Sequence, residues 1–325
     1  MLDIKFIREN SDLVKTATRN KQLDSLVVDQ AIVLDEKRRK LIQEVEILSA
    51  LKNKCAREKD MEKGKETKLK LQELEPKLKN IEKEFITVMY KIPNIVSEDT
   101  IVGKDEKENS VVRSWGTPRK FEFNPKDHLE LGVQLGIIDT ETASKVAGAR
   151  FNYLLGDAVL LQNALYQFAI EVLLGKGFIP VVPPLFISPD VYVRMARLSP
   201  ETEIERYHIT RDNQYLIGSA EHTLGPMHMD ETVNEKDLPL RYFAFTPAFR
   251  REAGSYGKDT KGILRQHQFD KLEMESFTTA ENGLKEQDFF ISIQEELMQA
   301  LEIPYQVVSI CTGDMGGPDF RQIDI

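Results

Sequence analysis

The stretch FRREAGSYGKDTKGILRQHQFDKLEM, residues 249–274, predicts two β-strands joined by a glycine-rich, basic loop. Side chains alternate between the two faces of a strand. Arg250 and Glu252 are therefore expected on one face of the strand that enters the loop. The strand that leaves the loop should present three residues on one face, Phe269, Lys271 and Glu273. The sequence thus predicts a sheet with charged side chains at its loop end.

The loop between these strands has the composition of an anion-binding turn. Glycine lets the backbone bend, and basic side chains bring positive charge to an anionic ligand. The glycines are Gly254, Gly257 and Gly262, and the basic residues are Lys258, Lys261 and Arg265. An ordinary charged hairpin with a flexible tip has the same two-residue period. The spacing alone therefore leaves open both a nucleotide site and a plain hairpin.

The residue types around the loop carry a family resemblance. An F-R-x-E run followed by an R-x-H-Q-F strand resembles the second signature motif of class II aminoacyl-tRNA synthetases, in the version found in bacterial-type seryl-tRNA synthetases. The resemblance implies a ligase that activates serine with ATP to seryl-adenylate and transfers it to tRNA(Ser), and to tRNA(Sec) where one exists. ATP and Mg2+ are the implied cofactors, and L-serine and tRNA the implied partners.

Carried over position by position, the resemblance implies an ATP site. Arg250 would bind the α-phosphate, and Glu252 would bind the adenine amino group. Arg265 would contact the distal phosphates, and Phe269 would stack on adenine. Arg251 completes the implied ATP-binding set. Of these residues, Arg250, Glu252 and Arg265 are the implied catalytic ones.

The run LIGSAE, residues 216–221, ends in a hydroxyl and a carboxylate two residues apart. A buried carboxylate needs a partner, which the ammonium of an amino acid would supply. The corresponding family run is T-x-E, so the resemblance implies that Ser219, Ala220, Glu221 and Glu273 bind serine. Ser219 replaces the family's threonine, which keeps the hydroxyl and loses a methyl group. A plain turn into a helix is the alternative interpretation of this run.

The run GFIPVVPPL, residues 177–185, predicts an extended segment that follows a helix ending in glycine. Proline cannot donate a hydrogen bond to a neighbouring strand, so the segment belongs at a sheet edge or an interface. It is similar to the first class II motif, with Pro184 at the position of the motif proline. The resemblance implies a homodimer that forms through Gly177–Leu185.

Apolar residues in steps of three and four predict two long helices near the N-terminus, with seams over residues 27–55 and 71–92. The polar stretch from Asp60 to Gly64 is expected to reverse the chain, so the helices should pair as an antiparallel coiled-coil arm. Pro76 lies inside the second helix, where proline removes a backbone hydrogen bond. A kink is therefore expected over residues 71–75.

The predicted tip of this arm is basic, although the protein as a whole carries a net charge of −9. Residues 52–70 hold eight basic and four acidic side chains. A dimerisation coiled coil with solvated charges would explain the seams, whereas basic residues at the tip favour binding to RNA phosphates. The family resemblance implies a tRNA-binding arm, whose contacts would be Lys52, Lys54, Arg57, Lys59, Lys63 and Lys65.

Length and composition predict an α+β protein of two domains. The chain has 325 residues and exceeds one typical core. We expect a helical arm over 1–105 and a class II catalytic domain over 106–325, in which helices flank an antiparallel sheet. A linker is expected over 92–118, with helices over 127–135 and 158–174.

The sequence also constrains compartment and metal chemistry. No continuous apolar run reaches the roughly 18 residues that span a bilayer, and the N-terminus is charged, so no membrane association and a cytoplasmic location are expected. The two cysteines, Cys55 and Cys311, indicate neither a disulfide framework nor a zinc site. The histidine spacing matches no standard zinc motif, and hydrogen-bonded histidines are expected instead at His222, His228 and His267.

The chain ends at Ile325, within what resembles the D-[IL]-E-x-W strand of the family. The family's third motif and its magnesium carboxylate are expected beyond this residue, so no metal ligand is predicted within the chain, which would be a truncated form. Two other functions stay open: a non-catalytic tRNA-binding or regulatory protein on the synthetase scaffold, and a synthetase for a different amino acid. The residues of the predicted adenylate site favour the catalytic interpretation.

Overall fold

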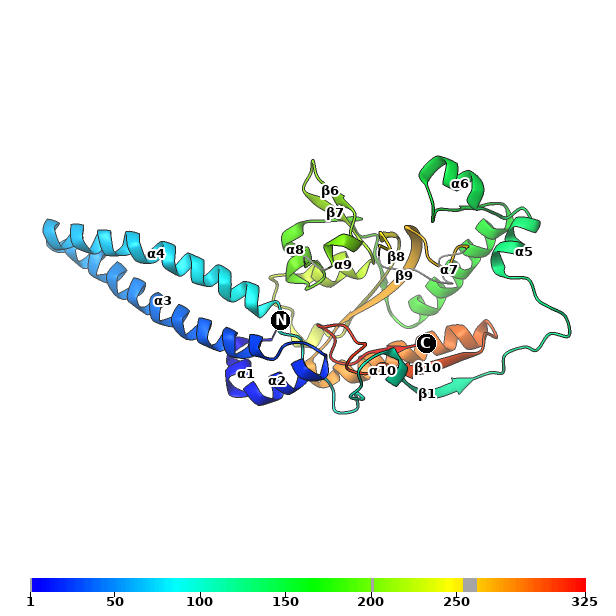
Figure 1. Ribbon diagram of the computed structural model, residues 1–325, viewed down its shortest axis with the longest axis horizontal. Helices are drawn as coiled ribbons and strands as arrows, with labels where there is room; N and C mark the ends of the chain where they lie inside the picture. Colours follow the sequence, from blue (N-terminus) through cyan, green and yellow to red (C-terminus); the bar gives the residue numbers. More distant parts are fainter. Residues whose placement is uncertain (1, 200–201, 254–261) are drawn as a thin grey trace. The chain divides into compact units, whose positions relative to one another are not determined.

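The computed structural model describes residues 2–199, 202–253 and 262–325 (Figure 1). Contacts divide the chain into two compact units. One unit comprises Met1–Ser114 together with Gln306–Ile325, and the other comprises Trp115–Tyr305. The last twenty residues therefore pack with the N-terminal helices. The functional division predicted at residue 105 stays a prediction.

The first unit is built on an antiparallel pair of long helices, α3 (Leu26–Glu58) and α4 (Met61–Met89), which Figure 1 shows running side by side. This confirms the predicted coiled-coil arm. The predicted reversal over Asp60–Gly64 is wrong in extent, because the chain turns at Lys59 and Asp60 alone. Lys59 adopts a left-handed conformation with φ +58°, and the Asp60 side chain caps α4 by accepting a hydrogen bond from the Lys63 N–H at 3.1 Å.

The base of the arm carries the core of this unit. Two short helices, α1 (Ile4–Glu9) and α2 (Ser11–Asn20), precede the arm and pack against it. The buried cluster consists of Ile7, Val14, Val28, Ala31, Leu34, Phe85, Met89 and Ile92. Helix α4 is continuous through Pro76, so the proline does not end the helix. The bend expected before it stays a prediction.

The segment predicted as a linker, residues 92–118, contains regular structure, which corrects that prediction. A 3-10 helix (Glu106–Glu108) is followed by strand β1 (Ser110–Trp115). The strand joins a sheet of order β1-β10-β11 with β10 (Tyr305–Ser309) and β11 (Ile323–Asp324). Glycine and proline near its ends mask the strand in the sequence, and its pairing depends on residues about 200 positions away.

In the first unit, an ammonium group fixes the loop between β10 and β11. Lys21 Nζ donates to the carbonyl oxygens of Gly316, Gly317 and Asp319 at 3.1, 2.9 and 2.6 Å. The side chain of Lys21 is buried, and burial lowers its pKa to about 8. The N-terminal helices and the C-terminal segment are thus joined by hydrogen bonds as well as by packing.

The second unit contains a sheet of order β4-β8-β9. Strands β8 (Leu240–Phe249) and β9 (Gln268–Phe277) pair antiparallel along their full lengths, and β4 (Ile179–Pro180) pairs parallel with β8 at the edge. This confirms the predicted hairpin and the edge position of residues 177–185. Helices α7 (Asp157–Gly175) and α10 (Gly283–Ala300) contribute to its core, which consists of Leu173, Phe178, Phe243 and Ile293.

A smaller sheet of order β5-β7-β6 lies in the same unit. Its strands are β5 (Phe186–Ile187), β6 (His208–Ile209) and β7 (Gln214–Leu216), and its neighbouring helices are α8 (Pro189–Arg194) and α9 (Glu221–Leu224). The remaining elements are α5 (His128–Gln134), β2 (Ile138–Asp139), α6 (Thr140–Ala147), β3 (Tyr153–Leu154) and the 3-10 helices Glu203–Glu205, Gly225–His228, Glu235–Asp237 and Ala280–Asn282. The helices predicted over 127–135 and 158–174 are confirmed as α5 and α7, and the architecture is α+β.

Helix α7 exposes an unusually apolar surface. Among the described residues, one helix is long and apolar enough to cross a bilayer by length and composition alone, and that helix is α7. Few of its side chains are buried within the chain, and several large ones are exposed: Val159, Leu160, Leu161, Leu165 and Leu174. The helix therefore presents an apolar face that no described part of the chain covers.

Candidate active site

The loop end of the β8–β9 hairpin brings a guanidinium and an aromatic ring together. The Arg250 guanidinium carbon lies 5.2 Å from the centre of the Phe269 ring. Arg250 Nε donates to the Gly218 carbonyl at 3.0 Å, and the Arg250 N–H donates to the His267 carbonyl at 3.0 Å. The predicted convergence of these two side chains is confirmed. A planar base that stacks on Phe269 would have the Arg250 cation beside its phosphates.

Glu252 differs from its predicted position. Strand β8 ends at Phe249, so Glu252 lies beyond the strand and adopts a left-handed conformation with φ +52°. Its carboxylate accepts a hydrogen bond from Arg265 Nη1 at 3.0 Å, and its carbonyl accepts one from Arg150 Nη1 at 2.8 Å. The ion pair brings Glu252 and Arg265 together across the loop. Two-residue strand spacing does not describe this turn, which corrects the predicted shared face.

The backbone on either side of the loop is tied to other segments of the second unit. The Arg251 N–H donates to the Glu205 carbonyl at 3.0 Å, and the Ile263 N–H donates to His128 Nε2 at 3.2 Å. Gly262 has φ +79°, and a Cβ there would lie 2.0 Å from the His128 ring, so glycine is required. The predicted loop residues Gly254, Gly257, Lys258 and Lys261 lie outside the described residues.

Small residues on β8 face the functional side chains of β9. Ala244 pairs with Glu273, Thr246 with Lys271, and Ala248 with Phe269. Directly paired residues project from the same face of an antiparallel sheet. The three residues on β8 are buried. The short side chains of β8 therefore leave room for a ligand beside the long side chains of β9.

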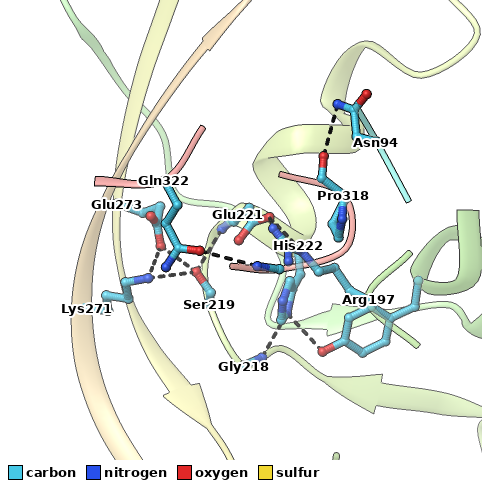
Figure 2. A network of polar contacts seen from close by, with 12 residues as sticks. Asn94, Arg197, Gly218, Ser219, Glu221, His222, Lys271, Glu273, Pro318 and Gln322 are labelled. Atoms are coloured by element: carbon cyan, nitrogen blue, oxygen red, sulfur yellow. Dashed lines mark hydrogen bonds and ion pairs between the residues drawn. The ribbon is translucent and has the colours of Figure 1, made fainter. Parts of the chain in front are cut away.

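A second polar group forms where the run from Gly218 to Glu221 meets β9 (Figure 2). The buried Ser219 hydroxyl donates to the Glu273 carboxylate. Lys271 Nζ lies 2.5 Å from Glu273 Oε2 and 3.2 Å from Ser219 Oγ. The ammonium of Lys271 therefore contacts the oxygen atoms that were predicted to bind the ammonium of serine.

Arg197 was not predicted, yet it contacts a predicted serine-binding residue. Arg197 Nε and Nη2 donate to Glu221 Oε1 at 2.9 and 2.6 Å (Figure 2). Arg197 follows α8 in an irregular segment, where no periodicity marks it. The side chain of Ala220 packs in a buried cluster with Leu224 and Ala244, so only its backbone is available to a ligand.

His222 supports the backbone at Gly218 through hydrogen bonds. Its Nδ1 accepts from the Gly218 N–H at 3.0 Å, and it lies 2.9 Å from the Tyr192 hydroxyl. Burial, followed by nearby Arg206, lowers the pKa of His222 to about 3, so the ring is neutral at physiological pH. The hydrogen-bonded histidine expected here is confirmed. His222 fixes Gly218, whose carbonyl in turn orients Arg250.

Three carboxylates of this site are engaged by cations. Glu252 pairs with Arg265, Glu273 with Lys271, and Glu221 with Arg197. Within the described parts of the chain, no group of three or more histidine, cysteine, aspartate or glutamate residues could hold a metal ion. The donor set does not fit a protein-bound Mg2+.

The predicted tRNA contacts gather at the distal end of the arm. Lys52, Lys54 and Arg57 lie in the last two turns of α3, and Lys59 lies in the turn. Lys63 and Lys65 lie in the first turn or so of α4. All six side chains are exposed. The tip predicted from the sequence is therefore confirmed as a solvent-facing basic cluster.

Comparison with protein families matches two parts of the chain. Residues 1–96 match the seryl-tRNA synthetase N-terminal domain, and residues 205–322 match the tRNA synthetase class II core domain (G, H, P, S and T). The chain is 40% identical to a serine–tRNA ligase of Petrotoga mobilis over all of this chain and 80% of the relative. It is 39% identical to the Dictyoglomus turgidum serine–tRNA ligase over all of this chain and 79% of the relative.

Solved structures give the same picture. The seryl-tRNA synthetase of Pyrococcus horikoshii in complex with ATP superposes with a TM-score of 0.91 at 37% identity, covering all of this chain and 80% of that one. The cytoplasmic serine–tRNA ligase of Naegleria fowleri in complex with AMP superposes with a TM-score of 0.87 at 32% identity, again over the whole chain and 78% of that one.

Proposed function

This chain belongs to the seryl-tRNA synthetase family, and from that premise we propose how its residues divide the work of a serine–tRNA ligase. The reaction joins serine to ATP as seryl-adenylate and then transfers the seryl group to tRNA(Ser), and to tRNA(Sec) where one exists. The observation that supports the assignment of roles is the contact of Arg250 with the Phe269 ring, together with the shared face of Phe269 and Glu273, which lies beside Ser219.

ATP binds at the loop end of the β8–β9 hairpin in this proposal. Adenine stacks on Phe269, and Arg250 binds the α-phosphate, since the guanidinium already lies over the ring. Glu252 accepts a hydrogen bond from the adenine amino group, and Arg265 contacts the distal phosphates. The ion pair between Glu252 and Arg265 positions both side chains at the nucleotide site before ATP binds. Arg251 adds a further cation at the start of the loop.

Serine binds where Ser219, Glu221 and Glu273 meet. Its ammonium contacts these oxygen atoms, which directs its carboxylate toward the α-phosphate. The carboxylate is ionised at neutral pH and needs no general base. Arg250 stabilises the charge that develops on the α-phosphate during attack, and the fixed amine lowers the entropic part of the barrier. The neutral His222 supports this geometry through Gly218.

Mg2+ accompanies ATP in this proposal. The described residues offer no carboxylate cluster for a metal ion, so the metal would enter together with the phosphates of ATP. The metal would neutralise phosphate charge when bound. Arg250 and Arg265 are the groups of this chain that provide positive charge at the phosphates.

The arm binds tRNA through the basic cluster at its tip. Each lysine or arginine that reaches a phosphate releases counterions and makes the affinity depend on salt. The six residues are Lys52, Lys54, Arg57, Lys59, Lys63 and Lys65. Their exposure and their clustering at the end of the helical arm support a role in tRNA binding rather than in chemistry.

A homodimer that forms through Gly177–Leu185 is also proposed, in the cytoplasm. The edge strand exposes 51% of Ile179, and the next residues expose 96% of Val182. The uncovered face of α7 directly precedes this segment. An apolar surface of this kind is favourable only if a partner covers it. A second copy of the chain would do so.

Serine-dependent exchange of pyrophosphate into ATP tests the assignment. The wild-type chain should exchange with serine and not with threonine, alanine or proline. Arg250→Gln should lower the exchange rate by about 10²- to 10³-fold, because it removes a donor to the developing charge. Arg211→Gln, an exposed arginine on the β6–β7 turn, is the matched control and should retain the rate. A folded chain that binds tRNA and gives no exchange would support a binding protein instead.

A further inference from the structure

Strand β9 carries one more polar side chain on the face that presents Lys271 and Glu273. Glu275 lies two residues past Glu273, so its side chain projects from the same face of the sheet. Its partner across the strand pair is Tyr242, whose hydroxyl lies 3.1 Å from His228 Nε2. Glu275 makes no hydrogen bond or ion pair with any residue in the described ranges, although its side chain is only partly exposed.

The charges around Glu275 already balance without it. Glu221 is paired with Arg197, and Glu273 is paired with Lys271. These two carboxylates and two cations come from α9, from the segment after α8 and from β9 itself, and β8 contributes the Tyr242 hydroxyl. Figure 2 shows both ion pairs beside Ser219. An ionised Glu275 would therefore be a third negative charge with no counterion.

This charge imbalance favours the protonated form of Glu275. Burial raises its pKa to about 8, and the negative charges of Glu221 and then Glu273 add to the effect, while Arg197 offsets part of it. At neutral pH the side chain is an uncharged carboxylic acid. A ligand that brings a positive charge would reverse the balance, because three cations would then face three carboxyl groups.

We propose that Glu275 is a further member of the amino-acid site, protonated while the site is empty and ionised when the ammonium of the substrate enters. The inference rests on the proposed serine site. Lys271 already neutralises Glu273, so the entering ammonium is balanced by the newly formed carboxylate of Glu275. The O–H bond of Glu275 breaks, both electrons stay on the carboxylate, and the proton passes to solvent. Serine binding is thereby coupled to the release of a proton.

The first test counts protons in the wild-type chain. L-serine is titrated calorimetrically at pH 7.0 in buffers of different ionisation enthalpy, where the slope of the observed heat gives the number of protons released. We expect close to one proton. We also expect the Kd for serine to fall by up to about tenfold per pH unit from pH 6 to 8. Serine remains a zwitterion over this range, so its own titration does not supply the proton.

The second test assigns the proton to its residue. Glu275→Gln keeps the size of the side chain and removes the ionisation, so serine should bind without proton release and with a Kd independent of pH from 6 to 8. Glu235→Gln, at an exposed position in the 3-10 helix before β8, is the matched control and should behave like the wild type.

The possible outcomes distinguish a failure of the role proposed for Glu275 from a failure of the proposed serine site. Serine binding by the wild type without proton release overturns the role of Glu275 and leaves the serine site intact. Proton release that persists in Glu275→Gln overturns it as well. A folded wild-type chain that binds no serine between pH 6 and 8.5 overturns the proposed serine site and the inference that rests on it. If the glutamine variant does not fold, the proton count of the wild type still decides the question.

Discussion

The carboxylic acid of Glu275 should make the stability of the second unit depend on pH in a way that one substitution removes. In the unfolded chain this carboxyl group titrates near its ordinary value of 4.5, whereas in the folded protein its pKa is about 8. Between these values the folded state holds a proton that the unfolded state has released. Stability is therefore fully present below pH 4.5 and declines as the pH rises through about 8.

The size of the stability change follows from the pH range between the unfolded and folded pKa values of Glu275. Each pH unit changes the free energy of unfolding by up to about 1.4 kcal/mol. Between pH 5 and 8 the wild type should lose roughly 3–4 kcal/mol of stability relative to Glu275→Gln, which has no proton to lose. Other groups titrate equally in both proteins, so the difference between the two isolates Glu275. The glutamine variant should be the more stable protein at pH 8.

Urea unfolding at half-unit steps from pH 5 to 8.5, followed by tryptophan fluorescence, measures this difference. Trp115 is the only tryptophan, belongs to the same unit as Glu275 and stacks on Tyr305 at 5.8 Å, so its signal reports on that unit. Glu235→Gln provides the control for the loss of an exposed carboxylate. Stability curves for the wild type and Glu275→Gln that stay parallel across the range would refute the raised pKa and the enclosed, unpaired position behind it.

Three further variants probe the proposed roles. Phe269→Leu should raise the KM for ATP by roughly tenfold in pyrophosphate exchange, since base stacking is worth about 1–3 kcal/mol; an unchanged KM would place adenine elsewhere. Arg197→Met removes both hydrogen bonds to Glu221, and the KM for serine should rise about 10- to 100-fold, because bonds to charged groups contribute about 1.5–3 kcal/mol; a change in the KM for ATP alone would contradict this. Lys54→Ala with Lys63→Ala should weaken tRNA binding and reduce its salt slope by about 2, while the rate of serine-dependent exchange stays the same; an unaltered salt slope would exclude these lysines from the interface.

Much of the fold followed from local patterns. The arm was predictable because one stripe of apolar residues in steps of three and four defines each helix, and Asp60 has the short polar side chain that caps a helix start. The strand that leaves the loop was predictable because alternating side chains define its faces, whereas the strand that enters it ends at Phe249, before the predicted positions of Arg250 and Glu252. Strand β1 was missed, since its pairing depends on β10 and not on its own residues.

The sequence by itself placed Phe269 and Glu273 on one face of a strand through their spacing, and the family resemblance predicted Arg250, Phe269, Ser219 and Glu273 as site residues. Only the tertiary structure decided their partners and charges. Arg197 reaches Glu221 from an irregular segment, and Glu275 keeps its proton because of burial and of the nearby carboxylates of Glu221 on α9 and Glu273 on β9. The physical reason is that the direction of a side chain depends on its near neighbours along the chain, whereas desolvation and Coulomb energy depend on whatever the fold places within a few ångströms.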